Sequence, residues 1–266
     1  MLNTTIYCLC LHNKVLPIIK KLGYVPVGLG SDKFSEEWLR DNTLDNISHK
    51  NKYYSEYTFN YWFWKNILPK IEDNHWVGFC GYREYWGNKK KITKDSKVED
   101  VVVREIPLEW KNYDTIVGEH LYINNLKLSK LIKRGLWSLV RNPSALFKSK
   151  RNIRFHFDMW HGNGNLDKAI DLLDDNDRED FRKYTRKNVS FSRGCMFVCR
   201  SKKIMNNYYS SLFPWLKRCE KIFGFNLKGY GNIRIYGFLA ERYHSYWFNK
   251  YTKALLWPVI FYDITK

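Results

Sequence analysis

Short apolar runs alternate with amphipathic stretches along the chain. The first run, "TIYCLCL" at residues 5–11, is rich in β-branched and aromatic side chains and predicts a buried strand. Residues 76–80 predict a central strand, and residues 115–123 and 192–201 predict further strands. Because such runs separated by helical patterns are typical of a mainly parallel sheet flanked by helices, we expect an α/β fold.

Residues 51–68 show the periodicity of a helix with an aromatic stripe. The stripe recurs at i, i+3, i+7, i+10 and i+14 and consists of Tyr54, Tyr57, Tyr61, Trp64 and Leu68. It predicts a helix that packs this stripe on the sheet, with Asn51 as its cap and Pro69 at its end. The polar residues between the aromatic ones would then lie nearer a ligand.

Four other segments shape the expected organisation. Residues 166–186 predict a helix, and residues 202–224 predict a helical region interrupted near Pro214. Residues 23–32 are broken by Gly and Pro, which suits a backbone that approaches a ligand. The apolar run at 254–264 is too short to cross a membrane, so we expect a buried strand or a docking tail there.

Residues 126–141 form a basic amphipathic stretch. Its apolar positions are Leu128, Leu131, Ile132, Leu136, Leu139 and Val140, and its basic ones are Lys127, Lys130, Lys133, Arg134 and Arg141. Two interpretations stay open: the apolar side packs on the core beneath a solvated basic side, or the helix lies on an anionic membrane. We expect one domain over residues 1–266, with residues 126–154 as a basic insertion that faces the membrane or the acceptor.

Composition favours anionic partners. Lys and Arg exceed Asp and Glu by 45 − 27 = 18, which favours phosphate-bearing ligands or anionic membranes. We find no secretory signal, no transmembrane run and no C-x-x-C pair among the six cysteines, so we expect reduced, buried thiols and a cytoplasmic protein. A nucleic-acid-binding module is an alternative, but no RNP, KH or helix-turn-helix pattern supports it, and we expect no nucleic-acid partner.

Polar residues that directly follow strand-like runs are the main candidates for ligand binding. Open α/β sheets bind ligands outside the carboxyl ends of their strands, where His12 and Asn13, and then Tyr82, Arg83 and Glu84, are expected. The Arg83 guanidinium can hold a pyrophosphate with two parallel hydrogen bonds, or it can simply be a solvent-facing strand end.

Two acidic or histidine-containing segments offer weaker candidates. The sequence "DDND" at 174–177 resembles a D-x-D metal signature, but its helical surroundings favour a solvated helix face. His156 and His161 lie five residues apart, near Asp158, but a zinc site would need a third ligand, which we do not find. We therefore interpret these residues as parts of a polar cleft, with Asp158 or His161 on the acceptor side. The sequence requires no cofactor, and a divalent Mg²⁺ or Mn²⁺ ion stays compatible with it.

Three ordered blocks resemble the signatures of a bacterial glycosyltransferase family long catalogued as a domain of unknown function. They are "DNISHKNKYYSEYTFNYWFWKN" (45–66), "WVGFCGYREYW" (76–86) and "IYGFLAERYHSYWF" (235–248). Family members occur in capsule and O-antigen clusters, and some relatives are assigned to galactofuranose transfer. Within the second block, Gly81 stands where His is usual and Glu84 where a second Arg is frequent, which can alter donor choice.

The resemblance implies a GT-A-like, Rossmann-like nucleotide-diphospho-sugar transferase. The residues it suggests for the donor are His12, Asn46, Ser48, Asn51, Lys65, Tyr82 and Arg83. For the base that takes the acceptor proton, Glu241 comes first, followed by Asp158 and Glu56, with an ion pair to Arg242 as the competing role of Glu241. His161 and Arg242 are expected on the acceptor side.

We therefore expect a hexosyltransferase that moves a sugar from a nucleotide-diphosphate donor to a glycan. The donor is expected to be a UDP-sugar, with UDP-galactofuranose as one candidate, and the acceptor a lipid-linked or surface polysaccharide such as capsule, O-antigen or lipooligosaccharide. The enzyme would work in the cytoplasm, peripherally on the inner face of the cytoplasmic membrane. A non-catalytic glycan-binding or assembly subunit is a further alternative.

Overall fold

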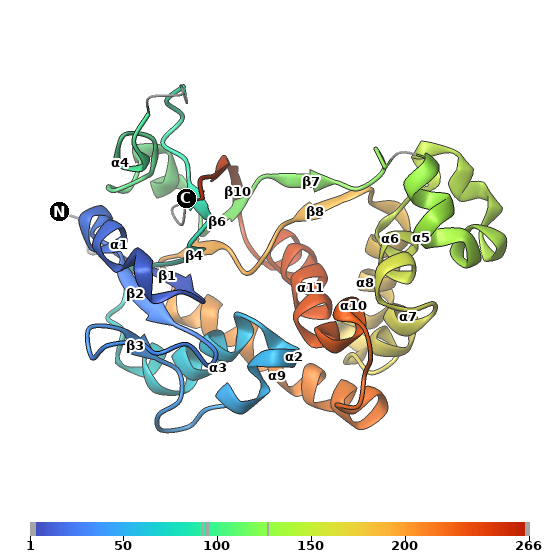
Figure 1. The fold of residues 1–266 in the computed structure, drawn as a ribbon, viewed down its shortest axis with the longest axis horizontal. Helices are drawn as coiled ribbons and strands as arrows, with labels where there is room; N and C mark the ends of the chain where they lie inside the picture. Colours follow the sequence, from blue (N-terminus) through green and yellow to red (C-terminus); the bar gives the residue numbers. More distant parts are fainter. Residues whose placement is uncertain (1–3, 92, 94–95, 127, 264–266) are drawn as a thin grey trace. The chain divides into compact units, whose positions relative to one another are not determined.

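The computed structural model describes residues 4–91, 93, 96–126 and 128–263, without the side chains of Leu128, Lys130, Lys133 and Arg134. The chain forms two compact units, each built from separate stretches of sequence (Figure 1). Unit 1 comprises Met1–Glu119, Gly194–Ser210 and Phe248–Lys266, and unit 2 comprises His120–Arg193 and Ser211–Trp247. One domain over residues 1–266, with a basic insertion at 126–154, stays a prediction.

A mainly parallel sheet organises unit 1. Its strands are β1 (Thr4–Cys10), β2 (Val25–Gly28), β3 (Leu39–Arg40), β4 (Trp76–Gly81), β5 (Glu84–Trp86), β6 (Thr115–Gly118), β9 (Phe197–Cys199), β10 (Ala254–Trp257) and β11 (Val259–Phe261). The order is β10-β6-β9-β4-β1-β2-β3, and β5 links β4 to β11. Within the main path only β9 runs antiparallel to its neighbours, so the expected mainly parallel sheet is confirmed.

Helices and short 3-10 turns flank this sheet. Unit 1 contains η1 (Asn13–Val15), α1 (Leu16–Leu22), η2 (Ser48–Lys50), α2 (Asn51–Tyr54), α3 (Tyr57–Asn66), η3 (Leu68–Lys70), α4 (Val98–Val101) and η4 (Leu108–Asn112). Two longer helices, α9 (Lys202–Phe223) and α11 (Ile235–Tyr251), contribute residues to both units. None of the helices in the described part of the chain is long and apolar enough to span a bilayer.

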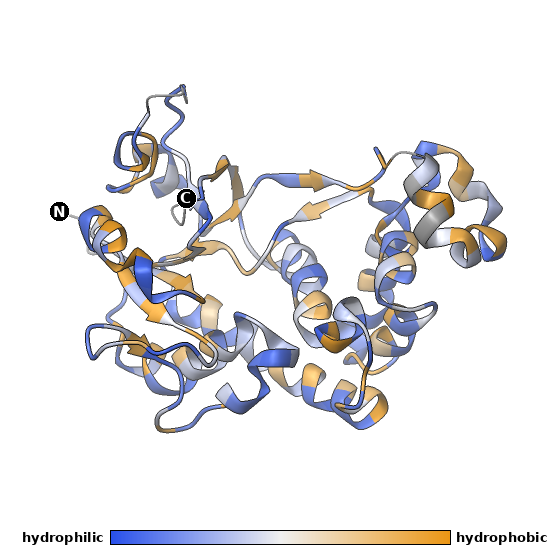
Figure 2. Cartoon of the chain, in the orientation of Figure 1, coloured by the Kyte–Doolittle hydropathy of each residue, from blue (hydrophilic) through white to orange (hydrophobic). Residues whose placement is uncertain are grey.

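The strand predictions hold best where the chain is most hydrophobic. The runs at 5–11 and 76–80 form β1 and β4, and both strands are largely hydrophobic in Figure 2. The run at 115–123 instead divides into β6 and β7 (His120–Tyr122), and the run at 192–201 lies across β8 (Ser190–Ser192) and β9. β2 lies within the Gly- and Pro-broken segment, where Pro26 pairs with Cys8 of β1.

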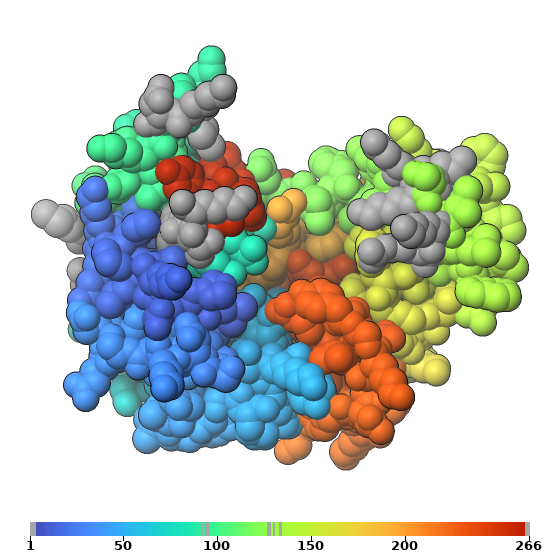
Figure 3. Space-filling model, in the orientation of Figure 1, coloured from blue at the N-terminus to red at the C-terminus, as the bar shows by residue number. Residues whose placement is uncertain are grey.

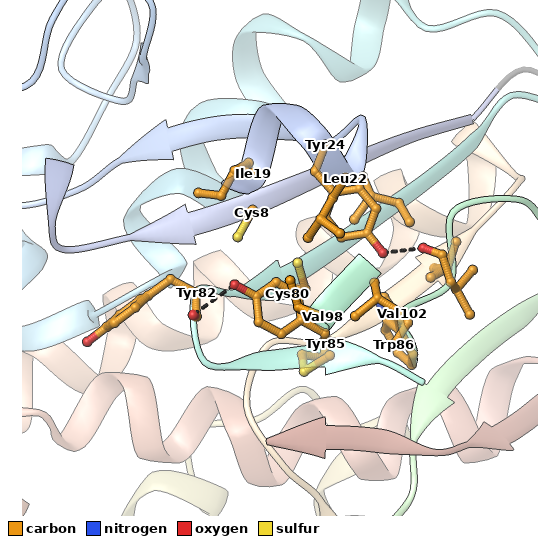
Figure 4. Packing of buried hydrophobic residues seen from close by; sticks show 14 of the residues in the cluster. Cys8, Ile19, Leu22, Tyr24, Cys80, Tyr82, Tyr85, Trp86, Val98 and Val102 are labelled. Carbon is orange, nitrogen blue, oxygen red and sulfur yellow. Dashed lines mark hydrogen bonds between the residues drawn. The ribbon is translucent and has the colours of Figure 1, made fainter. Parts of the chain in front are cut away.

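A hydrophobic core cluster of unit 1 lies between β1, α1, β4, β5 and α4 (Figure 4). Cys8, Ile19, Cys80, Tyr85 and Trp86 are completely buried there. The Tyr85 hydroxyl donates to the Tyr82 carbonyl oxygen at 2.8 Å, which fixes the turn after β4. All six cysteines are buried free thiols, as expected from their apolar surroundings.

The aromatic segment folds differently from the single helix predicted for residues 51–68. Ser55 adopts φ 57° and separates α2 from α3. Asn51 is not the cap that we expected, because its side-chain nitrogen donates to the Ser55 carbonyl oxygen and to Thr58 Oγ1 across this break. The break changes the helical phase, so the ring contacts to the sheet come from Phe59 and Phe63.

Phe59 and Phe63 are completely buried and join a cluster with Tyr7 of β1 and Phe79 of β4. Their ring centroids lie 5.4 and 5.5 Å from that of Tyr7. Tyr61 and Trp64 of the predicted stripe are only half-buried. Edge-to-face and tilted contacts of this kind stabilise the α3–sheet interface beyond the burial of apolar area.

Unit 2 consists of the antiparallel strand pair β7–β8 and a set of helices. These are α5 (Leu128–Arg141), η5 (Pro143–Leu146), η6 (Lys148–Lys150), α6 (Ile153–His161), α7 (Asn165–Ile170), α8 (Asp175–Lys187) and α10 (Tyr230–Ile233), with parts of α9 and α11. The helix predicted over 166–186 is thus two helices. The interruption predicted near Pro214 is wrong, because α9 continues through it and buried neighbours such as Leu212 and Trp215 hold it by packing.

Candidate functional site

The carboxyl ends of β1, β2, β3 and β4 lie at one edge of the unit 1 sheet, because these strands are parallel. His12 follows β1, and Tyr82 and Arg83 follow β4. The structure brings these three predicted residues together: the ring centroids of His12 and Tyr82 are 5.4 Å apart, edge to face. The guanidinium carbon of the exposed Arg83 lies 4.8 Å from the Tyr82 ring.

Two glycines leave space at this edge. Gly30, after β2, has φ 74°, and a Cβ there would lie 3.5 Å from Asn51 Oδ1, so predicted Asn51 borders this turn. A side chain at Gly81, where the resemblance predicts His, would meet no atom within 4 Å. The space directly beside the backbone at Gly81, next to Tyr82, is therefore open.

Glu56 belongs to the same edge. It directly precedes α3, and the Ser55 hydroxyl donates to its carboxylate. Burial raises the pKa of the Tyr82 hydroxyl, the Arg83 charge opposes this rise, and the Glu56 charge adds to it. Glu56 is therefore close enough to Tyr82 for the two groups to interact electrostatically.

The other predicted donor residues have local partners. Asn46 Oδ1 accepts hydrogen bonds from the backbone nitrogen and hydroxyl of Ser48, at 3.2 and 2.8 Å, which closes a turn before η2. Lys65 lies near the end of α3, where its ammonium nitrogen is 3.6 Å from the Trp64 ring centroid. That position is two helical turns from Thr58, so the structure does not bring Lys65 to the His12–Arg83 group.

Sequence reasoning missed Arg40, which ends the two-residue strand β3, and Asp41, which follows it. Arg40 donates to the Gly30 carbonyl oxygen at 3.0 Å and so fixes the turn after β2. Asp41 is 2% exposed, and its Oδ2 accepts no hydrogen bond from the described residues. Burial raises the pKa of Asp41, while a hydrogen bond with Thr58 opposes this rise. The strand was too short to give a hydrophobic run that could have drawn attention to this carboxylate.

Unit 1 contains a hollow of about 460 Å³, which is lined by residues between positions 88 and 109 and by Trp257. Glu99, Glu105 and Glu109 line it, and Glu109 pairs with Lys89 at 3.1 Å. Three basic side chains, Lys89, Lys90 and Arg104, line it as well, so its charges balance and do not select a phosphate group. We therefore place the candidate site at the His12–Arg83 edge, where the charged group nearest the rings is a guanidinium.

Asp158 of unit 2 lines a cavity of about 230 Å³ with Ser138, Arg141, Asn142, Arg154, Phe155, Asn163 and Gly164. Its Oδ1 accepts a hydrogen bond from the Gly164 backbone nitrogen at 2.9 Å. Burial raises the pKa of Asp158, and the Gly164 hydrogen bond and the Arg154 charge oppose the rise. A carboxylate among amides, a hydroxyl and guanidiniums can bind the hydroxyl groups of a sugar.

Arg242 and Glu241 form an ion pair in unit 2. Arg242 is 2% exposed, and its guanidinium carbon lies 4.0 Å from the Phe191 ring centroid. The competing role considered for Glu241, an ion pair with Arg242, is therefore present in the structure. Because Arg242 is buried, loss of its carboxylate partner would leave a buried charge without compensation.

His161 is 4% exposed and connects α6 to α10. Its Nδ1 lies 2.9 Å from the Gly231 carbonyl oxygen, and its ring stacks on Phe238 at 4.1 Å. Burial and the Arg242 charge lower the pKa of His161 to about 3. The neutral ring with a proton on Nδ1 donates to the Gly231 carbonyl, so His161 has a packing role.

The "DDND" acids have individual partners. Asp174 pairs with Arg218 at 3.0 Å and Asp175 with Arg178 at 2.9 Å, both on or beside α8. Buried Asp177 accepts hydrogen bonds from the hydroxyls of Tyr243 and Tyr246, at 2.6 and 2.9 Å. Within the described ranges, no three His, Cys, Asp or Glu side chains come together as metal ligands.

Comparisons with known proteins give one family match and one similar solved structure. Residues 6–253 match the family described as "Domain of unknown function (DUF4422)". The fold is similar to that of the apo structure of WbbM, a bifunctional glycosyltransferase, with a TM-score of 0.63 and 21% sequence identity. This match covers 97% of the present chain and 45% of WbbM, so the chain spans about half the length of that protein. No curated protein sequence matches. The expected GT-A-like α/β fold class is confirmed by this likeness.

Replacing Asp41 with Asn should stabilise the protein at neutral pH. The folded state raises the pKa of Asp41, so the ionised form destabilises the fold above the unfolded pKa, and the neutral amide removes this cost. We expect Asp41→Asn to increase the free energy of unfolding by up to about 1 kcal/mol at pH 7, measured by urea denaturation. The gain should disappear in acid, where wild-type Asp41 is protonated, and an equal gain at all pH values would contradict this account.

For His161 we expect the opposite pH dependence: its contribution to the free energy of unfolding falls as the pH falls. Because its folded pKa is lowered to about 3, the unfolded state binds a proton first as the pH falls below its ordinary value, and stability is lost. Between pH 7 and about pH 5.5 this histidine should cost the fold roughly 1 kcal/mol. His161→Asn retains an N–H donor for Gly231 and should abolish that part of the pH dependence. Exposed His49, replaced in the same way, is the control, and an unchanged pH profile in His161→Asn would refute the assignment.

Proposed function

The chain belongs to the DUF4422 family, and on this premise we propose that it is a glycosyltransferase acting on a nucleotide-diphosphate sugar. The observation that carries the proposal is the group formed by His12, Tyr82 and Arg83 at the carboxyl edge of β1 and β4. Ligands of open α/β sheets bind at this edge. The likeness to a solved glycosyltransferase supports the fold on which this group is presented.

Each part of a sugar nucleotide has a suitable partner in unit 1. The exposed Arg83 guanidinium can bind two diphosphate oxygens at once. The adjoining rings of His12 and Tyr82 offer apolar faces to the base or sugar. We propose a UDP-sugar as the donor and a hexose as the transferred group, with UDP-galactofuranose as one candidate.

The proposed reaction forms a bond between an acceptor hydroxyl oxygen and the anomeric carbon of the donor sugar. The bond from that carbon to the diphosphate oxygen breaks, and its electron pair leaves with the nucleoside diphosphate. The hydroxyl proton passes to a carboxylate. We propose Glu56 of unit 1 as this base, because its charge acts on Tyr82 at the sheet edge. For unit 2, taken by itself, we propose that the Asp158 cavity binds sugar hydroxyl groups.

The acceptor proposed is a lipid-linked or surface glycan. Carboxylate, amide and hydroxyl groups around Asp158 suit a sugar, and Arg141 and Arg154 suit a negatively charged one. A divalent Mg²⁺ or Mn²⁺ ion is compatible with the proposal, and the reaction as written places no step on it. A cytoplasmic enzyme at the inner face of the membrane would meet both substrates.

Arg83→Ala should weaken the binding of a UDP-sugar by about 10- to 100-fold, because it removes a bidentate, charge-assisted contact. Arg83→Lys should recover only part of this loss, since an ammonium cannot form the planar pair. Isothermal titration with UDP-sugar, UMP and uridine measures the effect, which should be largest for the diphosphate. Exposed Arg104→Ala, elsewhere in unit 1, is the control. Equal affinities for Arg83→Ala and wild type would refute the donor site, and a salt-dependent gel shift without sugar-nucleotide binding would favour the nucleic-acid-binding alternative.

Three carboxamide variants separate the proposed roles of the carboxylates. Glu56→Gln should lower kcat by about 10²- to 10⁴-fold without changing donor affinity. Asp158→Asn should mainly raise KM for the acceptor. Glu241→Gln should reduce thermal stability, because it leaves the buried Arg242 charge without its carboxylate partner. A kcat loss confined to Glu241→Gln, in a variant with wild-type stability, would transfer the role of base to Glu241.

A further inference from the structure

Helix α5 of unit 2 has two apolar sides. Leu131 and Leu139 are buried in a cluster with Phe155 and Met159 of α6. Gly135 lets the two helices approach closely, because a Cβ there would lie 2.9 Å from Met159. The side that packs on the core is thus complete, and the first of the two interpretations of residues 126–141 accounts for only part of the apolar positions.

The second apolar side is exposed. It comprises Ile132, Leu136, Trp137 and Val140 of α5, continues to Leu146 and Phe147 after the helix, and is called here the outer apolar face. Trp137 is 72% exposed and Phe147 is 70% exposed. Large apolar side chains gathered in this way on a protein surface mark an interaction site. Figure 3 shows part of this yellow-green segment at the surface.

The loop that carries Leu146 and Phe147 is held firmly. Buried Arg151 donates hydrogen bonds to the carbonyl oxygens of Ala145, Leu146 and Leu126, each at 2.9 Å. A guanidinium with several backbone acceptors fixes the path of the chain around it. The exposure of Leu146 and Phe147 is therefore built into unit 2.

The charge around this face has one sign. Residues 120–157 contain no Asp or Glu and have nine basic residues, namely Lys127, Lys130, Lys133, Arg134, Arg141, Lys148, Lys150, Arg151 and Arg154. Arg141, Lys148 and Lys150 are exposed. Lys127 and the side chains of Lys130, Lys133 and Arg134 lie outside what the structure describes. The acidic residues of the chain all lie elsewhere, so the segregation is specific to this segment.

We propose that the outer apolar face docks on an anionic lipid bilayer. Large apolar side chains can enter the boundary between headgroups and acyl chains, while neighbouring Lys and Arg meet anionic headgroups. Self-association through this face would bring two basic segments together and is opposed by their charge. The combination of Trp, Phe and Leu with the exposed positive charges of Arg141, Lys148 and Lys150 therefore favours a membrane over a second copy of the chain.

Docking would also place the Asp158 cavity close to the membrane surface. Ser138, Arg141 and Asn142, which line the cavity, come from the same helix or its end as the outer apolar face. The cavity would lie beside the headgroup layer, within reach of a glycan carried on a lipid. This consequence rests on the proposed function, whereas the docking itself does not.

Vesicle sedimentation with the full chain tests the proposal. We expect binding to vesicles that contain phosphatidylglycerol, weaker binding to pure phosphatidylcholine, and release by salt. Leu136→Ser/Trp137→Ser should reduce binding about tenfold or more by removing inserted apolar area, and Lys148→Glu/Lys150→Glu should do so by reversing charge. Both pairs are exposed, so thermal stability should change little.

Matched controls lie elsewhere on the chain. Leu108→Ser removes an equally exposed apolar side chain from unit 1, and Lys217→Glu/Lys221→Glu makes the same charge change on α9. Both controls should bind vesicles within about twofold of wild type. No binding of wild type at low salt, or equal losses in controls and test variants, would overturn the proposal.

Light scattering tests for a dimer in the absence of lipid. If wild type forms a dimer and does not bind vesicles, and Leu136→Ser/Trp137→Ser abolishes the dimer, the outer apolar face binds a second copy of the chain. UDP-sugar binding, measured separately, should be unchanged in all these variants. Its absence in wild type would count against the proposed function and leave the docking result intact.

Discussion

The parallel pairing of β1 with β2 and β4 determines where unit 1 can recognise a ligand. Parallel strands end at the same edge, so the residues after β1, β2, β3 and β4 converge although they are far apart in sequence. The aromatic cluster of Tyr7, Phe59, Phe63 and Phe79 holds α3 against this pair of strands. A shift of register in β4 would separate Tyr82 from His12, because both follow their strands directly.

The hydrophobic runs predict the central strands of the fold. They do not predict features that depend on local backbone conformation, such as the break between two helices. β1 and β4 are continuous apolar strands, which is the pattern of a sheet buried on both faces, and sequence alone predicts them. The break at Ser55 depends on a positive φ that Asn51 stabilises through its side chain, and a periodic aromatic stripe does not reveal it. The short strand β3 has no apolar signal, and Asp41 was missed for that reason.

Polar residues in unit 2 show why a motif does not define a role. Glu241 and Arg242 lie in a block that resembles a transferase family, and His161 was expected on the acceptor side, yet Arg242 and His161 are buried and make packing contacts. Removing one partner from a buried pair is costly, so a role in the fold is enough to account for these contacts. Asp158 differs because it lines a cavity, a property that only the three-dimensional arrangement of α5 and α6 provides.

The six buried thiols can report where the folded structure opens transiently. Cys8, Cys10 and Cys80 lie within the central strands, whereas Cys219 lies in the part of α9 that belongs to unit 2. A thiol-specific reagent can reach them only when the surrounding structure opens transiently, so the rate of labelling at each position reports the local opening free energy. Mass spectrometry of labelled peptides could therefore follow the two units separately, in the unmodified sequence and without an added probe.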